Sequence, residues 1–176
     1  MKNTIKTFAI TAVTAVLLSY NATAQSVASR LFENAASVML THSNEKDNST
    51  SLSSIHPRAV EEFQRSFRDV TGEKWAKTSD GYFASFTKDS VQTRVDYNRK
   101  GRWLETIRYY GEKKLPGDVS NSIKKSYNNY SILGATEVSF DNDPVYMVYI
   151  QNESHIKIIG VYQGDMTEVE SHKRVQ

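Results

Sequence analysis

Two segments of this chain carry apolar residues at positions i, i+4 and i+8, which is the spacing of one helix face. These residues are Ala59, Phe63 and Phe67 in the first segment and Val119, Ile123 and Tyr127 in the second. Pro57 and Pro116 stand just before the two stripes. Proline is tolerated in a first helical turn because its missing N–H would have no partner there. The pattern predicts two amphipathic helices, each with one face packed on an apolar surface.

After each predicted helix the apolar period changes to two, as in strands that have one wet face. In the first half, the positions after Trp75 are Tyr82, Ala84 and Phe86, then Val91, Val95 and Tyr97, then a strand from Trp103 to Tyr109. In the second half they are Val145, Met147 and Tyr149, then a strand from Ile156 to Tyr162, then a last strand from Met166. Turn-forming residues at 79–81, 98–101, 141–144 and 163–165 separate these strands.

The two halves, 55–110 and 114–173, therefore repeat the same order of features. A constant offset of 63 aligns Phe86 with Tyr149, and Trp103 with Met166. A tandem of helix-plus-meander units predicts an α+β domain with one antiparallel sheet, its helices on one face and its other face open to solvent. A single unit would expose its apolar face, so the halves are expected to share one core.

The first 24 residues have the three zones of a secretory signal peptide. Lys2 and Lys6 give a positive start, an apolar run covers residues 8–18, and Ala22-Thr23-Ala24 offers the small residues that signal peptidase requires. We expect cleavage between Ala24 and Gln25. A membrane anchor is disfavoured because a spanning helix needs about 20 apolar residues. The mature chain is therefore expected in the periplasm or the medium, with no stable membrane anchor.

Residues 25–42 predict a short amphipathic helix, with Val27, Leu31, Ala35 and Val38 on one face. Residues 43–54 are too polar to bury anything, and they predict a flexible linker. The helix either docks on the domain or merely leads into it, and the sequence leaves both possibilities open.

Charge and cysteine content narrow the possible functions. The chain has 22 Lys and Arg against 20 Asp and Glu. Because Lys2 and Lys6 lie in the signal peptide, the mature chain is neutral, and nothing in its charge calls for nucleic acid as a partner. No cysteine is present, which excludes disulfides, thiolate metal sites, thiol nucleophiles and a lipid-modified cysteine.

Five features of the sequence carry a family resemblance. They are the helix stripe from Ala59, the residue Trp75, the Asp80-Gly81-Tyr82 turn, the hairpin 101–106 and the second helix from Leu115-Pro116. Together they resemble the PepSY-like family of exported bacterial proteins with a β-lactamase-inhibitor-protein-like fold, over roughly residues 55–172. The second half departs from it, since Ala135 and Met166 stand where tryptophans are expected. The resemblance implies a continuous curved sheet and a place in the Gram-negative envelope, and it offers no catalytic residues to carry over. In the namesake of the fold, the concave sheet face grips a protein.

No catalytic or metal-binding constellation stands out. His42, His56, His155 and His172 lie in unrelated contexts, and none has a second ligand at metal spacing. Asp141-Asn142-Asp143 resembles the start of a calcium loop, but Tyr146 replaces the glycine at loop position six and Asn152 the acid at position twelve. No serine sits in a Gly-x-Ser-x-Gly or Ser-x-x-Lys context. We therefore predict a protein that is not an enzyme and has no cofactor and no metal site.

Some strands are apolar on both faces. Phe83 opposes the face of Tyr82, and Tyr146 opposes the face of Met147. We expect an exposed aromatic and cationic surface on the open sheet face, because aromatic side chains and arginine are typical of recognition hot spots. Its candidate residues are Phe83, Arg94, Trp103, Tyr146 and Lys157. The alternative is that the N-terminal helix or the linker covers this face, or that these residues fill a thick core.

These observations predict a periplasmic binding module whose partner is an unknown protein or peptide. A structural or regulatory envelope protein that docks through its N-terminal helix is the second hypothesis. An enzyme is the third, and it would require a deep pocket with convergent polar groups.

Overall fold

The structure is a computed structural model that describes residues 27–42, 50–140 and 143–174. The predicted signal peptide with its cleavage site at Ala24 and Gln25 lies outside these residues. Most of the predicted linker and the turn residues 141 and 142 also lie outside them, and so does the side chain of His42.

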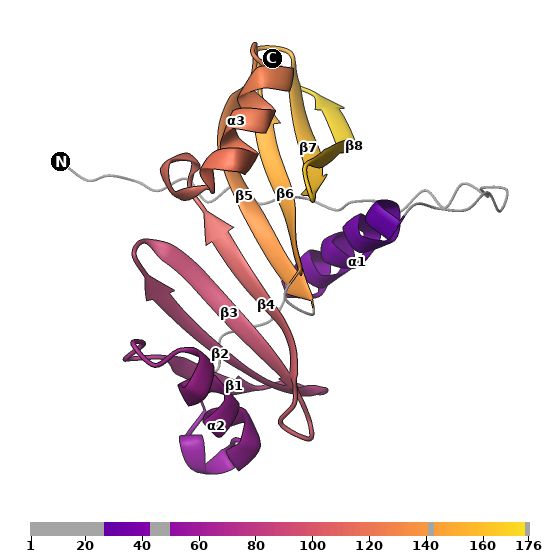
Figure 1. Ribbon diagram of the computed structural model, residues 1–176. Coiled ribbons are helices and arrows are strands. Elements are labelled where there is room, and N and C mark those ends of the chain that lie inside the picture. Colours follow the sequence, from indigo (N-terminus) through magenta and orange to yellow (C-terminus); the bar gives the residue numbers. More distant parts are fainter. Residues whose placement is uncertain (1–26, 43–49, 141–142, 175–176) are drawn as a thin grey trace, which may run out of the picture.

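Within the described residues, eight strands form a single antiparallel sheet in which each strand pairs with the next along the chain (Figure 1). The strands are β1 (Lys74–Lys77), β2 (Gly81–Lys88), β3 (Val91–Asn98), β4 (Trp103–Tyr110), β5 (Ser131–Phe140), β6 (Asp143–Gln151), β7 (His155–Tyr162) and β8 (Asp165–Lys173). Three α-helices in the described part of the chain accompany the sheet, so the predicted α+β class with an antiparallel sheet is confirmed. They are α1 (Val27–His42), α2 (Pro57–Ser66) and α3 (Gly117–Ser126).

Helix α2 begins where its sequence predicts. Pro57 is its first residue, and the side chain of His56 caps it by accepting the Arg58 N–H at 3.2 Å. Ala59 and Phe63 are buried against Trp75 and Val95 of the sheet. The predicted stripe therefore packs as an amphipathic helix face should.

Helix α3 follows β4 and precedes β5 in the sequence, and it packs on the sheet as α2 does. Its residues Val119 and Ile123 are buried against Ile132, Val148 and Ile159. Pro116 is the N-cap of this helix, one position before its first residue.

The strand register shows that α2 and α3 lie on the same face of the sheet. One row of cross-strand partners runs Trp75, Ala84, Val95, Thr106, Ser139 and Pro144. Trp75 lies under α2, and Val148, which follows Pro144 by an even number of residues, lies under α3. Because alternate strand residues share a face, one side of the sheet carries both helices.

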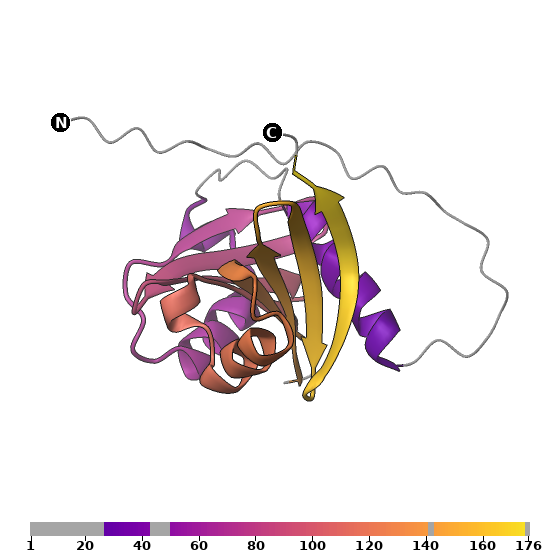
Figure 2. The ribbon, with the colours of Figure 1, turned by 90° about the horizontal axis from the view of Figure 1, so that it is seen from above.

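Helix α1 lies on the opposite face, so the helices are not confined to one side as expected. Phe32 and Ala35 of α1 are buried against Ile107, Val138 and Met147, whose side chains point away from α2 and α3. Figure 2 shows α1 on one side of the last strands and α3 on the other. Over β4 to β7 the face predicted to be open is therefore covered by the chain's own N-terminal helix.

Two segments differ from the sequence-based expectation. Residues 131–140 were not predicted as a strand, yet they form β5, a central strand of the sheet. The end of the predicted linker is ordered, since Leu52–Ser54 form a 3-10 turn and the Thr50 N–H donates to the Trp75 carbonyl at 2.6 Å.

Candidate binding surface

The face that α1 covers carries an apolar strip that crosses four strands. Its residues are Ile107 on β4, Val138 and Phe140 on β5, Val145 and Met147 on β6, and Ile158 and Tyr162 on β7. Ile107, Val138 and Val145 are direct cross-strand partners, and all three are fully buried. A sheet face that met water would carry polar side chains at these positions. The residues of the strip are therefore suited to a covered position and not to contact with water.

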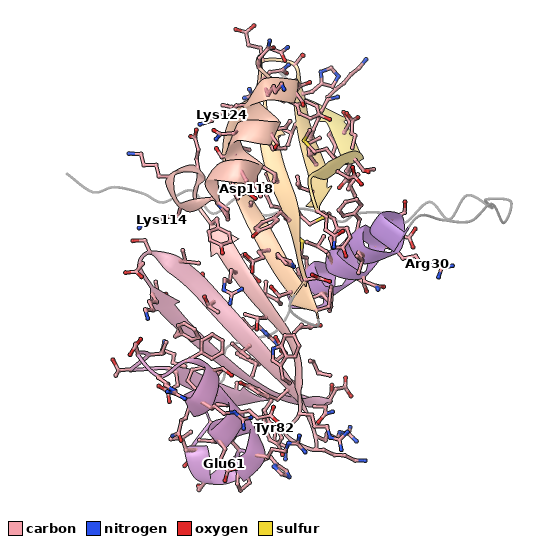
Figure 3. All side chains as sticks on the ribbon, viewed as in Figure 1. Arg30, Glu61, Tyr82, Lys114, Asp118 and Lys124 are labelled. Atoms are coloured by element: carbon pink, nitrogen blue, oxygen red, sulfur yellow. The ribbon has the colours of Figure 1, made fainter. Side chains whose placement is uncertain are left out.

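Helix α1 meets the strip with an amphipathic surface. Phe32 and Ala35, three residues apart, are fully buried, and Leu31, Ala36 and Met39 pack around them. The opposite side of α1 is exposed at Arg30 and Asn34, and Figure 3 shows Arg30 pointing away from the sheet. This is the arrangement by which helices lie in apolar grooves, with anchors at i, i+3 and i+4.

The contact between α1 and the sheet is close in one place. Met147 pairs with Gly160 across β6 and β7, and the ring of Phe32 rests on that glycine. A Cβ atom at Gly160 would lie 2.7 Å from two of the ring carbons, so only glycine leaves room for Phe32 there. One side-chain hydrogen bond between α1 and the sheet is weak. In it the Tyr149 hydroxyl donates to the Met39 sulfur at 3.8 Å.

The five predicted surface residues do not come together. Phe83 and Arg94 lie on the α1 face over β2 and β3, but both are buried, with 5% and 8% of their surface exposed. The Arg94 guanidinium stacks 3.7 Å from the Phe83 ring centroid and donates to the Asp96 carboxylate at 2.8–3.0 Å. This pair is therefore an internal cluster and not an exposed surface.

Trp103, Tyr146 and Lys157 lie on the other face, with α2 and α3. Trp103 packs against the core under α2, and its indole N–H donates to the Thr106 hydroxyl at 3.0 Å. Tyr146 packs against the core under α3. Lys157 donates to Glu168 at 2.6 Å, and that hydrogen bond raises the pKa of the lysine. The single surface expected from the five residues is thus not formed, because they are divided between the two faces of the sheet. Whether any of them contacts a partner stays a prediction.

Between α2 and α3 lies a buried carboxylate that the sequence did not single out. Glu137 on β5 forms an ion pair with its cross-strand partner Arg108, and it accepts hydrogen bonds from Tyr110 at 2.8 Å and Ser139 at 2.9 Å. Burial, and then the negative charge of Glu137, raise the pKa of Tyr146. Because its donors come from β4 and β5, no local motif reveals this cluster.

The described residues offer no metal centre. Across 27–42, 50–140 and 143–174, no three His, Asp or Glu side chains are grouped to hold a metal ion. Among the helices in that part of the chain, none is long and apolar enough to cross a membrane.

Comparison with solved structures identifies the architecture. A BLIP-like protein from Bacteroides fragilis matches with a TM-score of 0.54 and 16% identity, over 68% of this chain and 86% of that one. A DUF2874 family protein from Bacteroides ovatus matches with a TM-score of 0.53 and 17% identity, over 68% and 88%. The fold is similar to that of BLIP-like proteins.

A third structure, from Bacteroides eggerthii, carries the description of a periplasmic protein. It matches with a TM-score of 0.51 and 14% identity, over 68% of this chain and 88% of that one. A scan of protein-family models and a search of curated proteins found no match to this chain. At these identities the likeness extends to the fold alone.

Proposed function

We propose that this chain is an exported, non-enzymatic binding module that accepts an amphipathic helix of another protein on the apolar strip. The observation that supports this function is the occupant already there. Helix α1 covers a sheet face that is apolar where an antiparallel sheet is usually polar. Helix α1 also indicates which partner would fit: a helix with a large aromatic anchor, a small residue three positions later and a polar outer face.

Displacement of α1 is energetically feasible because its contact with the sheet is small. Two of the α1 side chains that the structure describes are fully buried, and the remaining contacts are partial. Elements with few buried apolar contacts open at a lower free-energy cost than the core. Because α1 belongs to the same chain, it competes for the strip at an effective concentration of about millimolar. A partner present at a lower concentration must therefore have a proportionally lower Kd for the strip than α1 has.

A helix in trans tests the strip directly. The probe is a fluorescein-labelled peptide with the sequence of residues 27–42, titrated into the full mature chain and into its Phe32→Ala variant. The Phe32→Ala change weakens the tethered helix by about 3 kcal/mol, and therefore the variant should bind the peptide at least tenfold more tightly (about 1.4 kcal/mol). A peptide with alanine in place of Phe32 should not bind, whereas one with alanine in place of the exposed Asn34 should bind like the parent. Equal binding by both chains would contradict the proposal.

The second candidate function is docking of α1 itself onto a partner. The small number of buried α1 side chains also favours this function, because α1 could leave the sheet at low cost. Capture from a periplasmic extract separates the two functions. If the strip binds the partner, Phe32→Ala increases capture and the free α1 peptide competes it away. If α1 is the docking element, Phe32→Ala weakens capture instead.

Export and repeat structure belong to the same proposal. We infer that signal peptidase cleaves after Ala24, so that N-terminal sequencing of protein from the periplasmic fraction should begin at Gln25. We also infer that the domain is a tandem of two PepSY-like units. In support, α2 and α3 each precede four strands, and their buried residues Phe63 and Ile123 occupy the same place in each helix. A mature protein that begins elsewhere, or stays in the cytoplasm, would contradict the export claim.

A further inference from the structure

A groove lies at the C-terminal end of α2, on the face away from α1. Its volume is about 510 Å³, within the range of ligand sites, and its walls come from α2 and from strands β3 to β6. Phe67 and Trp103 give it two half-buried aromatic walls, while Arg65 and Arg108 bring guanidinium groups to it from different elements.

The acidic groups of this groove are recessed and already satisfied. The Glu137 side chain is 6% exposed and holds Arg108, Tyr110 and Ser139. Glu62 accepts the Arg58 Nε–H at 2.9 Å and the Trp103 backbone N–H at 3.1 Å. Burial acts to raise the pKa of Glu62, but these donors hold it below the ordinary value. Neither carboxylate is free to bind a cation.

The basic groups, by contrast, face solvent. The Arg108 side chain is 31% exposed although it is paired with Glu137. Arg65 is exposed, and it makes no hydrogen bond or ion pair within the part of the chain that the structure describes. A cation in the last turn of α2 suits the helix dipole, which accounts for Arg65 but not for Arg108 on β4. The accessible charge of the groove is therefore positive.

A second hollow of about 310 Å³ continues the groove along the end of α2. It shares Ser66, Phe67 and Arg108 with the first and adds the exposed Arg68, the ion pair of Lys88 with Asp69, and the exposed Asp89. Two joined hollows suit an extended chain better than a single compact molecule. Planar guanidinium groups bind carboxylates with paired hydrogen bonds, and clusters of arginine recognise acidic motifs.

We propose that this groove binds an extended acidic peptide segment. Its carboxylates pair with Arg65 and Arg108, and an apolar side chain between them packs on Phe67 and Trp103. The Thr106 oxygen already accepts the Trp103 indole N–H, so its hydroxyl hydrogen stays available to donate to the peptide. This site does not depend on the proposed function, because it lies on the opposite face of the sheet from the apolar strip.

The test uses the full mature chain and a labelled peptide, Ser-Glu-Phe-Glu-Phe-Ser, with a Gln-for-Glu peptide as the neutral control. Fluorescence anisotropy should show binding of the acidic peptide alone, weakened by added salt. Arg65→Gln should reduce its affinity about fivefold to tenfold. Lys124→Gln, the same charge change on α3, should leave the affinity within about twofold. Figure 3 shows Lys124 on α3, away from α2.

Two further variants keep the outcome decisive. Arg65→Lys should retain part of the affinity, and Phe67→Leu should weaken the peptide without changing the salt dependence. Equal binding of the acidic and neutral peptides would overturn the proposal. So would an equal loss in the Arg65→Gln and Lys124→Gln variants, because it would show a general charge effect in place of a site.

Discussion

The ring of Phe32 on α1 rests on Gly160 of β7, where an added Cβ would come within 2.7 Å of two ring carbons and 2.9 Å of a third. Gly160→Ala should therefore loosen α1 and lower the free energy of unfolding by about 1–3 kcal/mol. Urea unfolding measures the loss. Hydrogen exchange should place it in α1, whose amides should exchange faster while those of β4 and β5 change little.

The matched control is Gly117→Ala at the start of α3. No atom lies within 4 Å of a Cβ built there, so this change should be neutral or slightly stabilising. Equal stability of the Gly160→Ala variant and the parent would show that the Phe32 ring can shift away from the new methyl group at little cost in free energy.

Glu137→Gln should destabilise the domain because it leaves Arg108 without its counter-charge. Breaking a fully buried pair costs about 3–5 kcal/mol. Since the Arg108 side chain is 31% exposed, we expect about 2 kcal/mol here. Glu168→Gln removes the counter-charge of Lys157 and should cost clearly less, because the Glu168 side chain is 41% exposed whereas that of Glu137 is 6% exposed. Thermal unfolding of the two variants should rank them in this order, and the reverse ranking would reject the argument.

Trp75 and Trp103 should respond differently to replacement by phenylalanine. The Trp75 indole N–H is buried and has no acceptor among the described residues, while that of Trp103 donates to Thr106. Removing an unsatisfied donor recovers about 1–3 kcal/mol, which offsets the packing lost with the larger ring. Trp75→Phe should therefore stay within about 1 kcal/mol of the parent stability. A loss of several kcal/mol in urea unfolding would show that the indole N–H does have a partner.

Alkaline pH should unfold the domain through tyrosines near Glu137. Burial, together with the hydrogen bond and charge of Glu137, raises the pKa of Tyr110 and Tyr146 above the ordinary value of 10.0. Above that pH the unfolded chain binds fewer protons than the folded one, and stability falls as pH rises. The contribution is complete below about pH 10. The double variant Tyr110→Phe, Tyr146→Phe should flatten this fall, as measured by urea unfolding at stepped pH, and an unchanged slope would contradict the prediction.

The sequence revealed the helices better than the strand faces. The helical stripe of Ala59, Phe63 and Phe67 is interrupted by the charged Glu61 and Arg65. A strand would place these two on the same face as the stripe, whereas a helix does not. The strands of the second half run Met147, Val148, Tyr149 and Ile150, which are apolar on both faces. Because alternation is lost there, nothing in the pattern says which face meets α3.

A one-residue slip explains the misplaced surface. The offset of 63 equated Phe86 with Tyr149, but the residues that take matching places under α2 and α3 are Ala84 with Val148, and Val95 with Ile159. A shift of one residue moves every side chain to the opposite face. The slip therefore grouped Tyr146 and Lys157 with Phe83 and Arg94, which point the other way.

Strand β5 was missed for a related reason. Its residues 131–140 are central, and five consecutive residues from Ala135 to Ser139 are buried on both faces, among them Thr136 and Glu137. Their partners, such as Arg108, come from the neighbouring strand. Polar residues that are satisfied across strands look like loop residues in a single sequence.

The position of α1 has a consequence for the order of folding. Every strand pairs with its neighbour in the chain, so the sheet can grow hairpin by hairpin as residues appear. The site for α1 requires Ile107, Met147 and Gly160 together, although α1 precedes all of them in the chain. Helix α1 therefore settles only after β7 is in place, and until then its apolar side is available to other chains.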